Sequence, residues 1–305
     1  MTDEDHEEVL AVTHPGQHHT DDAMAAGILK LVYGGGLWFE RSHNPVLIAE
    51  ADVVFDVGRE YDEERLRFDH HQGASDPKLP VDPARPKGYA SAGLVWKRFG
   101  REVCKKSLSM KGVENPSDSD ITDLVGKVDK ALMVPIDNWD NGIHPRGSKV
   151  IPIQHLVGAV SWRMAVSACS SLLKGSLNHF ANSVWTRDIL SEDLHKEGGP
   201  RVWIIGGHYI LESAPDLRLD LGAAKYMMLE RYGEQPLAVI SPMGSGKWAL
   251  LFNERKVEKS TRKAFSQRVK DVTLHASGAM AFATTPRRLV DAVKILVGMP
   301  GAFSK

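Results

Sequence analysis

The sequence predicts an α/β protein of two domains, the first built on a mainly parallel sheet. Two observations predict this. Apolar runs typical of strands are interspersed with longer helix-forming stretches, in the order strand, helix, strand, strand at the start of the chain. The length of 305 residues suits two domains of roughly 150 residues.

The first half contains the elements that place the candidate site. Strands are expected over residues 9–13, 37–41 and 52–57, and a helix over 21–32. Asp21 or Asp22 is expected to cap that helix, because both lie in its acidic first turn. Ligands bind at the carboxyl ends of parallel strands, and His14 and Asp56 both fall there.

The remainder of the first half is expected to be a loop and two helices. Residues 74–89 carry four prolines and indicate an irregular loop that could form a lid over a site. One helix is expected over 91–99, ended by Gly100, and a longer one over 118–136. Residues 143–154 show no clear period and begin the connection between the halves.

The second half is expected to be a smaller α/β domain after a helical connection. Strands are expected over 201–205, 209–211, 237–240 and 248–252, the last two joined as a hairpin, and helices over 155–197, 219–230, 259–270 and 286–296. We therefore divide the chain into a domain over 1–145, a helical connection over 146–200 and a domain over 201–305.

Charge is divided unequally between the halves. Residues 1–140 hold 26 acidic and 16 basic side chains, whereas residues 141–305 hold 13 acidic and 22 basic ones. Balances of −10 and +9 thus lie behind the formal net charge of −1. Such an asymmetry indicates different partners for the two halves.

Composition excludes several classes of protein. No apolar run approaches the ~18 residues that a membrane span needs, and the acidic start is unlike a signal or transit peptide, so a cytoplasmic location is expected. Cys104 and Cys169 stand apart, which excludes a thiolate zinc site. With 13 histidines beside two cysteines, any metal would be held by imidazole and carboxylate.

Four polar motifs close strands or helices of the first half. The first places five candidate ligands within nine residues: His14, His18, His19, Asp21 and Asp22. Imidazole and carboxylate suit Mn²⁺, Mg²⁺, Fe²⁺ or Zn²⁺. A polar surface loop followed by a helix cap would give the same pattern.

The other three motifs add aspartates and a tandem histidine pair. Asp56 emerges from an apolar strand, where a carboxylate is costly to bury without a partner, unless it only caps a turn. His70 and His71 point in different directions, so one could bind a metal and the other a substrate. Asp137 and Asp140 are spaced to share a helix face, and they repel unless a cation lies between them, although one could be a cap.

Together the four motifs offer enough ligands for two divalent ions that share a carboxylate. Two ions about 3.5–4 Å apart are the usual machinery of phosphoryl hydrolysis.

In this order the motifs resemble the melanocyte-proliferating-gene family. They are His-x-Gly-x-x-His-x-Asp, Asp-Val-Gly, Phe-Asp-His-His-Gln, Ser-Ala-Gly-Leu-Val and Asp-x-x-Asp-Asn-Gly, within residues 13–142. The resemblance resumes near residue 237 and includes a His-x-Ser-Gly motif at 275–278. That family, long labelled a metal-dependent protein hydrolase, is associated with RNA 3′–5′ exonuclease activity. It is similar to the DHH phosphoesterases, which implies a DHH-like first domain.

The resemblance implies a role for each metal position. His14 and His19 would bind the first ion, Asp21 and His70 would bind the second, and Asp56 would bridge both.

It also implies roles around the ions. Asp137 or Asp140 would complete the second site, with Asp137 slightly favoured. Asp69 would orient an imidazole, and His71 would contact the scissile phosphate or assist the leaving group. The substrate backbone would be held by four residues of the second half: Lys247, His275, Ser277 and Gly278.

Several positions depart from the family pattern. His18 stands where Phe is usual, so it could pack as an aromatic or compete with His19 as a ligand. Asn138 and Trp139 replace an alanine and an aliphatic residue. The metal positions are all retained, which favours intact hydrolysis in a divergent member of the family.

Basic residues gather in the second half. They are Lys247, Arg255, Lys256, Lys259, Arg262, Lys263, Arg268 and Lys270. A cationic wall suits a polyanionic substrate, although a solvated helix face would look the same.

The expected function is a divalent-metal-dependent phosphodiesterase, a 3′–5′ exonuclease acting on RNA or short oligonucleotides with two Mn²⁺ or Mg²⁺ ions. One alternative is a phosphohydrolase acting on pyrophosphate or a cyclic dinucleotide. Another is a silent metal-binding regulatory protein. No membrane partner is expected, and the oligomeric state, a dimer included, is left open.

Overall fold

The computed structural model describes residues 8–72, 76–113, 115–144, 153–193, 199–215, 219–243, 246–257, 261–262, 269 and 271–298. The chain divides into two compact units, residues 1–181 and 182–305, and each is described by itself. The long helix α7 (Trp162–Asp193) runs through the boundary between them. The division into 1–145, 146–200 and 201–305 stays a prediction.

Unit 1 contains a five-stranded sheet, and its mainly parallel character is confirmed. Its strands, in the order β2-β1-β3-β5-β4, are β2 (Leu37–Arg41), β1 (Val9–Thr13), β3 (Val53–Phe55), β5 (Arg67–Phe68) and β4 (Tyr61–Asp62). Only the β4–β5 pair is antiparallel. The register pairs Val12 with Val54 and Phe55 with Phe68. β1, β3 and β5 therefore end at the same edge.

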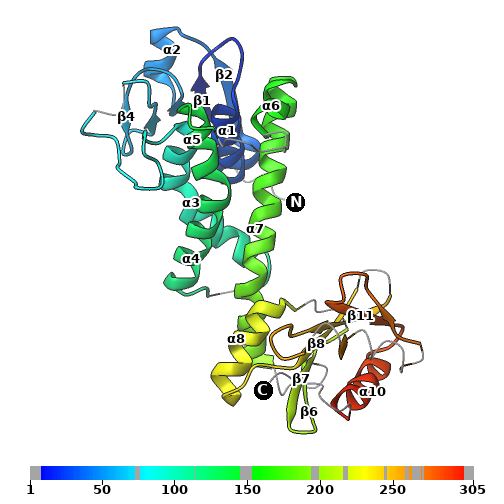
Figure 1. Ribbon diagram of the computed structural model, residues 1–305. Coiled ribbons are helices and arrows are strands. Elements are labelled where there is room, and N and C mark those ends of the chain that lie inside the picture. Colours follow the sequence, from blue (N-terminus) through cyan, green and yellow to red (C-terminus); the bar gives the residue numbers. More distant parts are fainter. Residues whose placement is uncertain are drawn as a thin grey trace. The chain divides into compact units, whose positions relative to one another are not determined.

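Helices cover both faces of this sheet (Figure 1). Unit 1 contains α1 (Thr20–Tyr33), a 3-10 turn (Gly34–Gly36), α2 (Pro45–Glu50), α3 (Ser91–Ser109), α4 (Asp118–Val128), a π-helical turn (Asp129–Met133), α5 (Val134–Asp140), α6 (Ile153–Gly158) and the first part of α7. Alternate strand residues point to opposite faces. Val54 packs towards Ile48 of α2, while Phe68 meets Phe99 of α3 edge to face.

Two glycines on the α3 side of the sheet make room for close contacts, one between helices and one within α3. A Cβ atom at Gly27 of α1 would lie 3.1 Å from the backbone nitrogen of Ser170 in α7, so these helices meet backbone to backbone. At Gly100 a Cβ atom would lie 2.9 Å from the Trp96 indole. The prediction that Gly100 ends its helix is wrong, because here the glycine makes room for an indole and α3 continues to Ser109.

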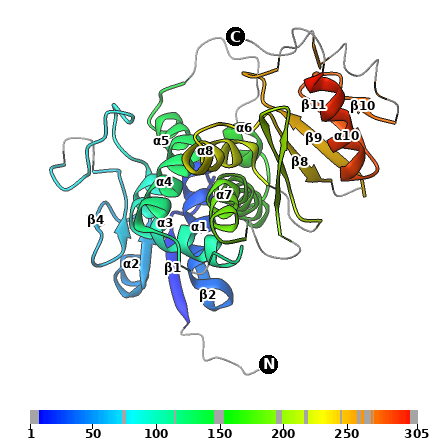
Figure 2. The same cartoon turned by 90° about the horizontal axis from the view of Figure 1, so that it is seen from below.

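Unit 2 contains a six-stranded mixed sheet, the last part of α7 and two further helices whose bounds are described. The order is β10 (Thr273–Leu274), β11 (Met280–Ala283), β9 (Trp248–Phe252), β8 (Ala238–Pro242), β7 (His208–Glu212) and β6 (Arg201–Ile205), with α8 (Leu221–Tyr232) and α10 (Pro286–Val297). Figure 2 shows α10 beside β9 and β11. Leu289 and Val293 of α10 are buried in one cluster with Leu250 and Ala281, and α8 contributes to a second buried cluster of this unit.

Most predicted elements match, with small differences at their ends. The helical stretch predicted over 155–197 is two helices, α6 and α7, and the sequence did not predict α2, β4, β5, β10 or β11. The predicted strands over 9–13, 37–41, 201–205 and 248–252 have the observed bounds. The helix predicted over 118–136 extends to Asp140 through the π-helical turn. The N-cap of α1 is His19, and Asp22 sits three residues later, where its Oδ1 accepts the His19 backbone N–H at 2.9 Å. Most of the helix predicted over 259–270 lies outside the described residues.

Within the described part of the chain, no helix is both long enough and apolar enough to cross a bilayer.

Candidate metal centre

The candidate metal centre lies at the sheet edge where β1, β3 and β5 of unit 1 end. His14 directly follows β1, Asp56 follows β3, and Asp69 follows β5. The C-terminus of α5 reaches the same edge, where Asp140 Oδ2 lies 3.4 Å from Nε2 of His70. The prediction that His14 and Asp56 lie at carboxyl ends of strands is confirmed.

Asp56 stands at the centre of this cluster, with its two carboxylate oxygens directed at two histidines. Its Oδ2 lies 3.3 Å from Nε2 of His14, and its Oδ1 lies 3.3 Å from Nε2 of His70. The hydroxyl of Ser91 donates to Oδ1 at 3.2 Å. Asp56 is buried and its backbone is left-handed with φ of 58°, a conformation that Asp tolerates better than most residues. This turn presents the carboxylate as a bridging ligand would require.

His14 presents one ring nitrogen to the carboxylates. Its Nδ1 lies 2.9 Å from the carbonyl oxygen of Pro15, which can only accept, so Nδ1 carries a hydrogen. Nε2 faces Oδ2 of Asp22 at 3.1 Å as well as Asp56. The Asp22 carboxylate beside Nε2 raises the pKa of His14, and burial opposes this. A neutral Nε2 would repel both carboxylates unless a cation lay between them, which suits a metal ligand.

A second group of ligand atoms surrounds His70. Its Nε2 lies 3.9 Å from Oδ2 of Asp21. A nitrogen of His19 and carboxylate oxygens of Asp21 and Asp140 lie within 4.8 Å of one another. His19 thus groups with these residues, whereas the resemblance implies that it shares the first ion with His14. Burial raises the pKa of Asp21 well above its usual range and also raises that of Asp140, and the charge of Asp56 adds to both effects. A cation among these carboxylates would remove the repulsion between them.

Buried polar atoms that make no hydrogen bond converge on this cluster. Among the described residues they include Nε2 of His14, Nε2 of His70, both carboxylate oxygens of Asp21 and Oδ2 of Asp22. Leaving such an atom unsatisfied costs about 1–3 kcal/mol. Divalent cations would satisfy several of them at once, and imidazole with carboxylate suits Mn²⁺ or Mg²⁺ among others. The residues therefore fit the predicted metals.

Asp69 and His71 form a pair beside the cluster. Asp69 Oδ1 accepts from Nδ1 of His71 at 2.6 Å, while its Oδ2 accepts from the backbone of Arg59 at 2.6 Å. The hydrogen bond to Asp69 raises the pKa of His71, and burial opposes this. The His71 side chain is 53% exposed, with Nδ1 3.7 Å from Oδ1 of Asp56. Asp69 thus orients the His71 ring and leaves its Nε2 available to a substrate.

The structure separates the two aspartates of the fourth motif. Asp140 joins the His70 group, whereas Asp137 is fully buried, where it accepts hydrogen bonds from Nε of Arg85 and, at 3.0 Å, from the backbone of Gly93. The geometry does not support the preference for Asp137 as a ligand. The physical reason is a buried guanidinium from a distant loop, which no local spacing reveals.

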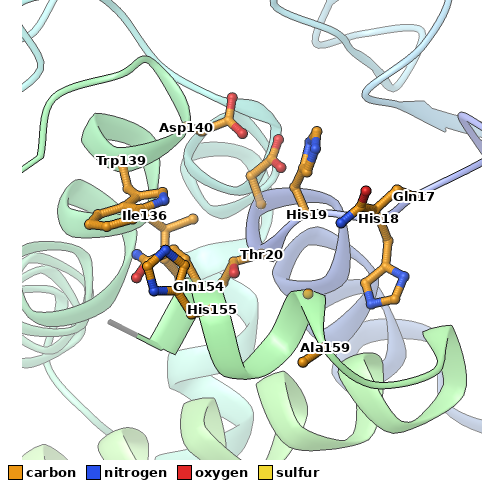
Figure 3. Close-up of a pocket in the computed structure, with 12 residues that line it drawn as sticks. Gln17, His18, His19, Thr20, Ile136, Trp139, Asp140, Gln154, His155 and Ala159 are labelled. Carbon is orange, nitrogen blue, oxygen red and sulfur yellow. The ribbon is translucent and has the colours of Figure 1, made fainter. Parts of the chain in front are cut away.

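His19 and His18 point in different directions (Figure 3). His18 is buried, its Nε2 lies 3.1 Å from the carbonyl oxygen of Val157, and its ring meets Trp162 edge to face. His18 therefore packs as an aromatic side chain would, one of the two roles open to it. His19 supplies the nitrogen near Asp140.

The substrate-binding residues predicted in unit 2 lie at two ends of its sheet. His275, Ser277 and Gly278 form the turn between β10 and β11, with Nδ1 of His275 2.9 Å from the Ser277 hydroxyl and φ of 72° at Gly278. The register of β9 on β11 puts Lys247 at the far end of β9, roughly 13–16 Å from this turn. The structure does not bring Lys247 together with the other three.

Some of the eight basic residues over 247–270 form ion pairs with acidic side chains. Lys259, Lys263, Arg268 and Lys270 lie outside the described residues. Arg262 is buried and binds Glu254 at 3.0 Å, and Lys256 binds Glu234 at 3.4 Å. The described part of the run gives little support to a cationic wall.

Two hollows flank the metal cluster. The larger, of about 480 Å³, shares His19, Asp21 and Asp140 with the cluster and has Trp139 in its wall. The smaller, of about 340 Å³, is lined by His14, His43, Asp56, Arg59, Asp69 and His71, among others.

Sequence reasoning missed several residues of this centre. Asp22 is a candidate ligand of the first motif, but the resemblance implies no metal role for it. Ser91 begins the Ser-Ala-Gly-Leu-Val motif, but no role was predicted for its hydroxyl. Arg59 and His43 carry no signal in the sequence, because their place depends on turns that follow β3 and β2.

Comparisons with known proteins agree with the predicted family. The family model MYG1_exonuc, described as "Uncharacterised protein family (UPF0160)", matches residues 10–172. The MYG1 protein of Dictyostelium discoideum is 29% identical over 187 residues, covering 60% of this chain and 51% of that protein. The MYG1 exonuclease of Homo sapiens is 33% identical over 136 residues, covering 43% of this chain and 35% of that protein. The matches thus span a third to a half of these relatives.

Among solved structures, RecJ in complex with Mn²⁺ from Thermus thermophilus gives a TM-score of 0.27 at 13% identity, covering 97% of this chain and 53% of that chain. This likeness is too low to carry an argument. The family model, in contrast, matches more than half of the 305 residues, including every motif of the metal cluster, and the chain belongs to the MYG1 (UPF0160) family.

Proposed function

We propose that this chain is a divalent-metal-dependent phosphodiesterase, an exonuclease that acts in the 3′–5′ direction on RNA or short oligonucleotides. The observation that carries the proposal is the position of Asp56, whose two oxygens each lie 3.3 Å from a different histidine nitrogen, on His14 and on His70. Family members named MYG1 exonuclease support it, although each extends well beyond the matched region.

Two sets of side chains would hold the ions. His14 and Asp22 would bind on one side of Asp56, and the other side has four residues: His19, Asp21, His70 and Asp140. Divalent ions bound there supply charge opposite a phosphate and lower the pKa of a water molecule. Mn²⁺ and Mg²⁺ are compatible with this donor set, because four of its seven side chains are carboxylates.

His71 is the residue best suited to the leaving group. Its Nδ1 is held by Asp69 at 2.6 Å, which directs Nε2 away from that carboxylate. An exposed imidazole in this position can hold a proton for the departing oxygen. The cationic Arg59 lines the smaller hollow together with His71, and there it can bind a neighbouring phosphate.

The proposal is tested by assaying three substrates with Mn²⁺. Wild-type protein should convert 5′-labelled RNA into a ladder of shortened labelled fragments, whereas the opposite polarity would release the labelled nucleotide first. Hydrolysis of pyrophosphate without hydrolysis of RNA would point to a small-substrate phosphohydrolase. Bis-p-nitrophenyl phosphate reports phosphodiester cleavage without any nucleotide.

Asp56→Asn should abolish all metal-dependent hydrolysis. The matched control is Asp52→Asn, an identical change at the other end of the same strand, where Asp52 accepts a backbone hydrogen bond from Leu10 at 2.8 Å. The control should keep its activity. Full activity in Asp56→Asn would refute the proposal.

Three further expectations belong with this proposal. Substrate binding by the His275–Gly278 turn and by Lys247 stays a prediction, and so does a cytoplasmic location.

A further inference from the structure

The larger hollow beside the metal cluster differs in chemistry from the smaller one. Its walls come from the loop before α1, from α5 and from α6 (Figure 3). Away from the three residues that it shares with the cluster, the wall is made by neutral or apolar groups, among them Trp139, Ile136, Gln17, Gln154 and Ala159. No Lys or Arg stands among its described lining residues, whereas Arg59 lines the other hollow.

Trp139 is held in place in this wall. It immediately precedes Asp140 in α5, so a group that contacts the indole is close to the metal cluster. Its ring centroid lies 4.1 Å from that of His144 and 5.4 Å from that of His155, with interplanar angles of 61° and 86°. Two imidazoles therefore brace the indole edge to face, a favourable geometry for aromatic pairs. In Figure 3 the indole forms one side of the hollow, next to Ile136.

The amide side chains supply the polar contacts. Gln17 and Gln154 each carry one acceptor and one donor group, which is what recognition of the edge of a nucleobase requires. A volume of about 480 Å³ lies within the range of small-ligand sites, 300–1,000 Å³. The hollow thus combines an aromatic plane, hydrogen-bonding amides and a metal cluster at one end.

We propose that this hollow is the subsite for the base of the nucleotide whose phosphate is bound at the metal cluster. Trp139 stacks on the base, and Gln17 and Gln154 contact its edge. The inference rests on the proposed function and deepens it, because a subsite of this size takes a single nucleotide unit and therefore suits removal of one nucleotide at a time.

The test compares two ligands that share a phosphate and differ in the base. AMP and ribose 5-phosphate are titrated calorimetrically into the full chain loaded with Mn²⁺. Stacking of a base on an aromatic ring corresponds to about 5- to 150-fold in affinity. Wild-type protein should therefore bind AMP more tightly than ribose 5-phosphate by a factor in that range.

Three variants assign the preference to the indole. Trp139→Leu should remove most of the preference for AMP while its affinity for ribose 5-phosphate stays within about twofold, and Trp139→Phe should keep most of it, because a ring remains. Trp38→Leu is the matched control: Trp38 is 61% exposed on β2 and lines neither hollow. This variant should behave as wild type.

Equal binding of AMP and ribose 5-phosphate by wild-type protein would overturn the subsite, as would a full AMP preference in Trp139→Leu. If RNA is hydrolysed in a metal-dependent manner in either case, the proposed function stands and only the subsite fails. If wild-type protein binds neither ligand and hydrolyses no phosphodiester, the proposed function fails together with the subsite.

Discussion

Gly93 offers a sharp test of how α3 and α5 are joined. Asp137 of α5 is fully buried, and its carboxylate is held by Arg85 and by the backbone N–H of Gly93 at 3.0 Å. A Cβ atom added at Gly93 would lie 2.7 Å from Cγ and 2.8 Å from Oδ1 of Asp137. These are far inside van der Waals contact, so Gly93→Ala must displace a buried carboxylate.

The magnitude follows from the loss of that pairing. Breaking a buried ion pair while its charges stay buried costs about 3–5 kcal/mol. In a unit of 150–250 residues, 1 kcal/mol corresponds to roughly 2–4 °C in Tm. We therefore expect Gly93→Ala to lower the melting temperature of unit 1 by about 6–20 °C, measured by circular dichroism.

Gly126→Ala is the matched control. Gly126 lies within α4, and a Cβ atom there would meet nothing within 4 Å. Replacing a glycine inside a helix by alanine, where space allows, stabilises by about 0.4–1 kcal/mol. If Gly93→Ala melts with or above Gly126→Ala, the tight packing of Asp137 between Arg85 and Gly93 is refuted.

Three other substitutions test separate parts of the centre. Asp22→Asn should weaken Mn²⁺ binding about 10–100-fold by calorimetry, because Asp22 faces the ligand nitrogen of His14 at 3.1 Å; unchanged affinity would exclude it from the centre. His71→Gln should lower kcat on RNA about 10²–10⁴-fold with Mn²⁺ affinity preserved, and equal losses in both would make His71 a ligand instead of a proton donor. His275→Ala should raise KM for RNA and leave kcat on bis-p-nitrophenyl phosphate unchanged, whereas an unchanged KM would exclude the turn from substrate binding.

Seven of the strands could be predicted from the sequence, whereas β4, β5, β10 and β11 were not. The run Val9–Thr13 is apolar and ends at His14, and the run that contains β3 ends at Asp56, so the position of both side chains followed from strand polarity alone. Local pattern was enough because parallel neighbours end at one edge of the sheet.

The sequence could not predict which of two similar residues joins the metal cluster where distant residues decide it. Asp137 and Asp140 look alike in the sequence, and only Arg85, 52 residues away from Asp137, distinguishes them. His18 and His19 are adjacent, and the carbonyl oxygen of Val157 decides which one turns away from the cluster. These are tertiary contacts, which no periodicity encodes.

The end of α3 was predicted wrongly for a similar reason. Glycine is a poor helix former, so the sequence predicts that Gly100 ends α3, but the indole of Trp96 packs over it and the helix continues. Packing outweighs propensity at such a position.

A titration of Mn²⁺ into metal-free protein tests the central claim most directly. Wild-type protein and Asp52→Asn should each bind two ions per chain, because Asp56 lies between two sets of ligands. Asp56→Asn should lose high-affinity binding at both sites, since its carboxylate faces both His14 and His70. If Asp56→Asn binds two ions with wild-type affinity, or if wild-type protein binds none, a metal centre organised by Asp56 is contradicted.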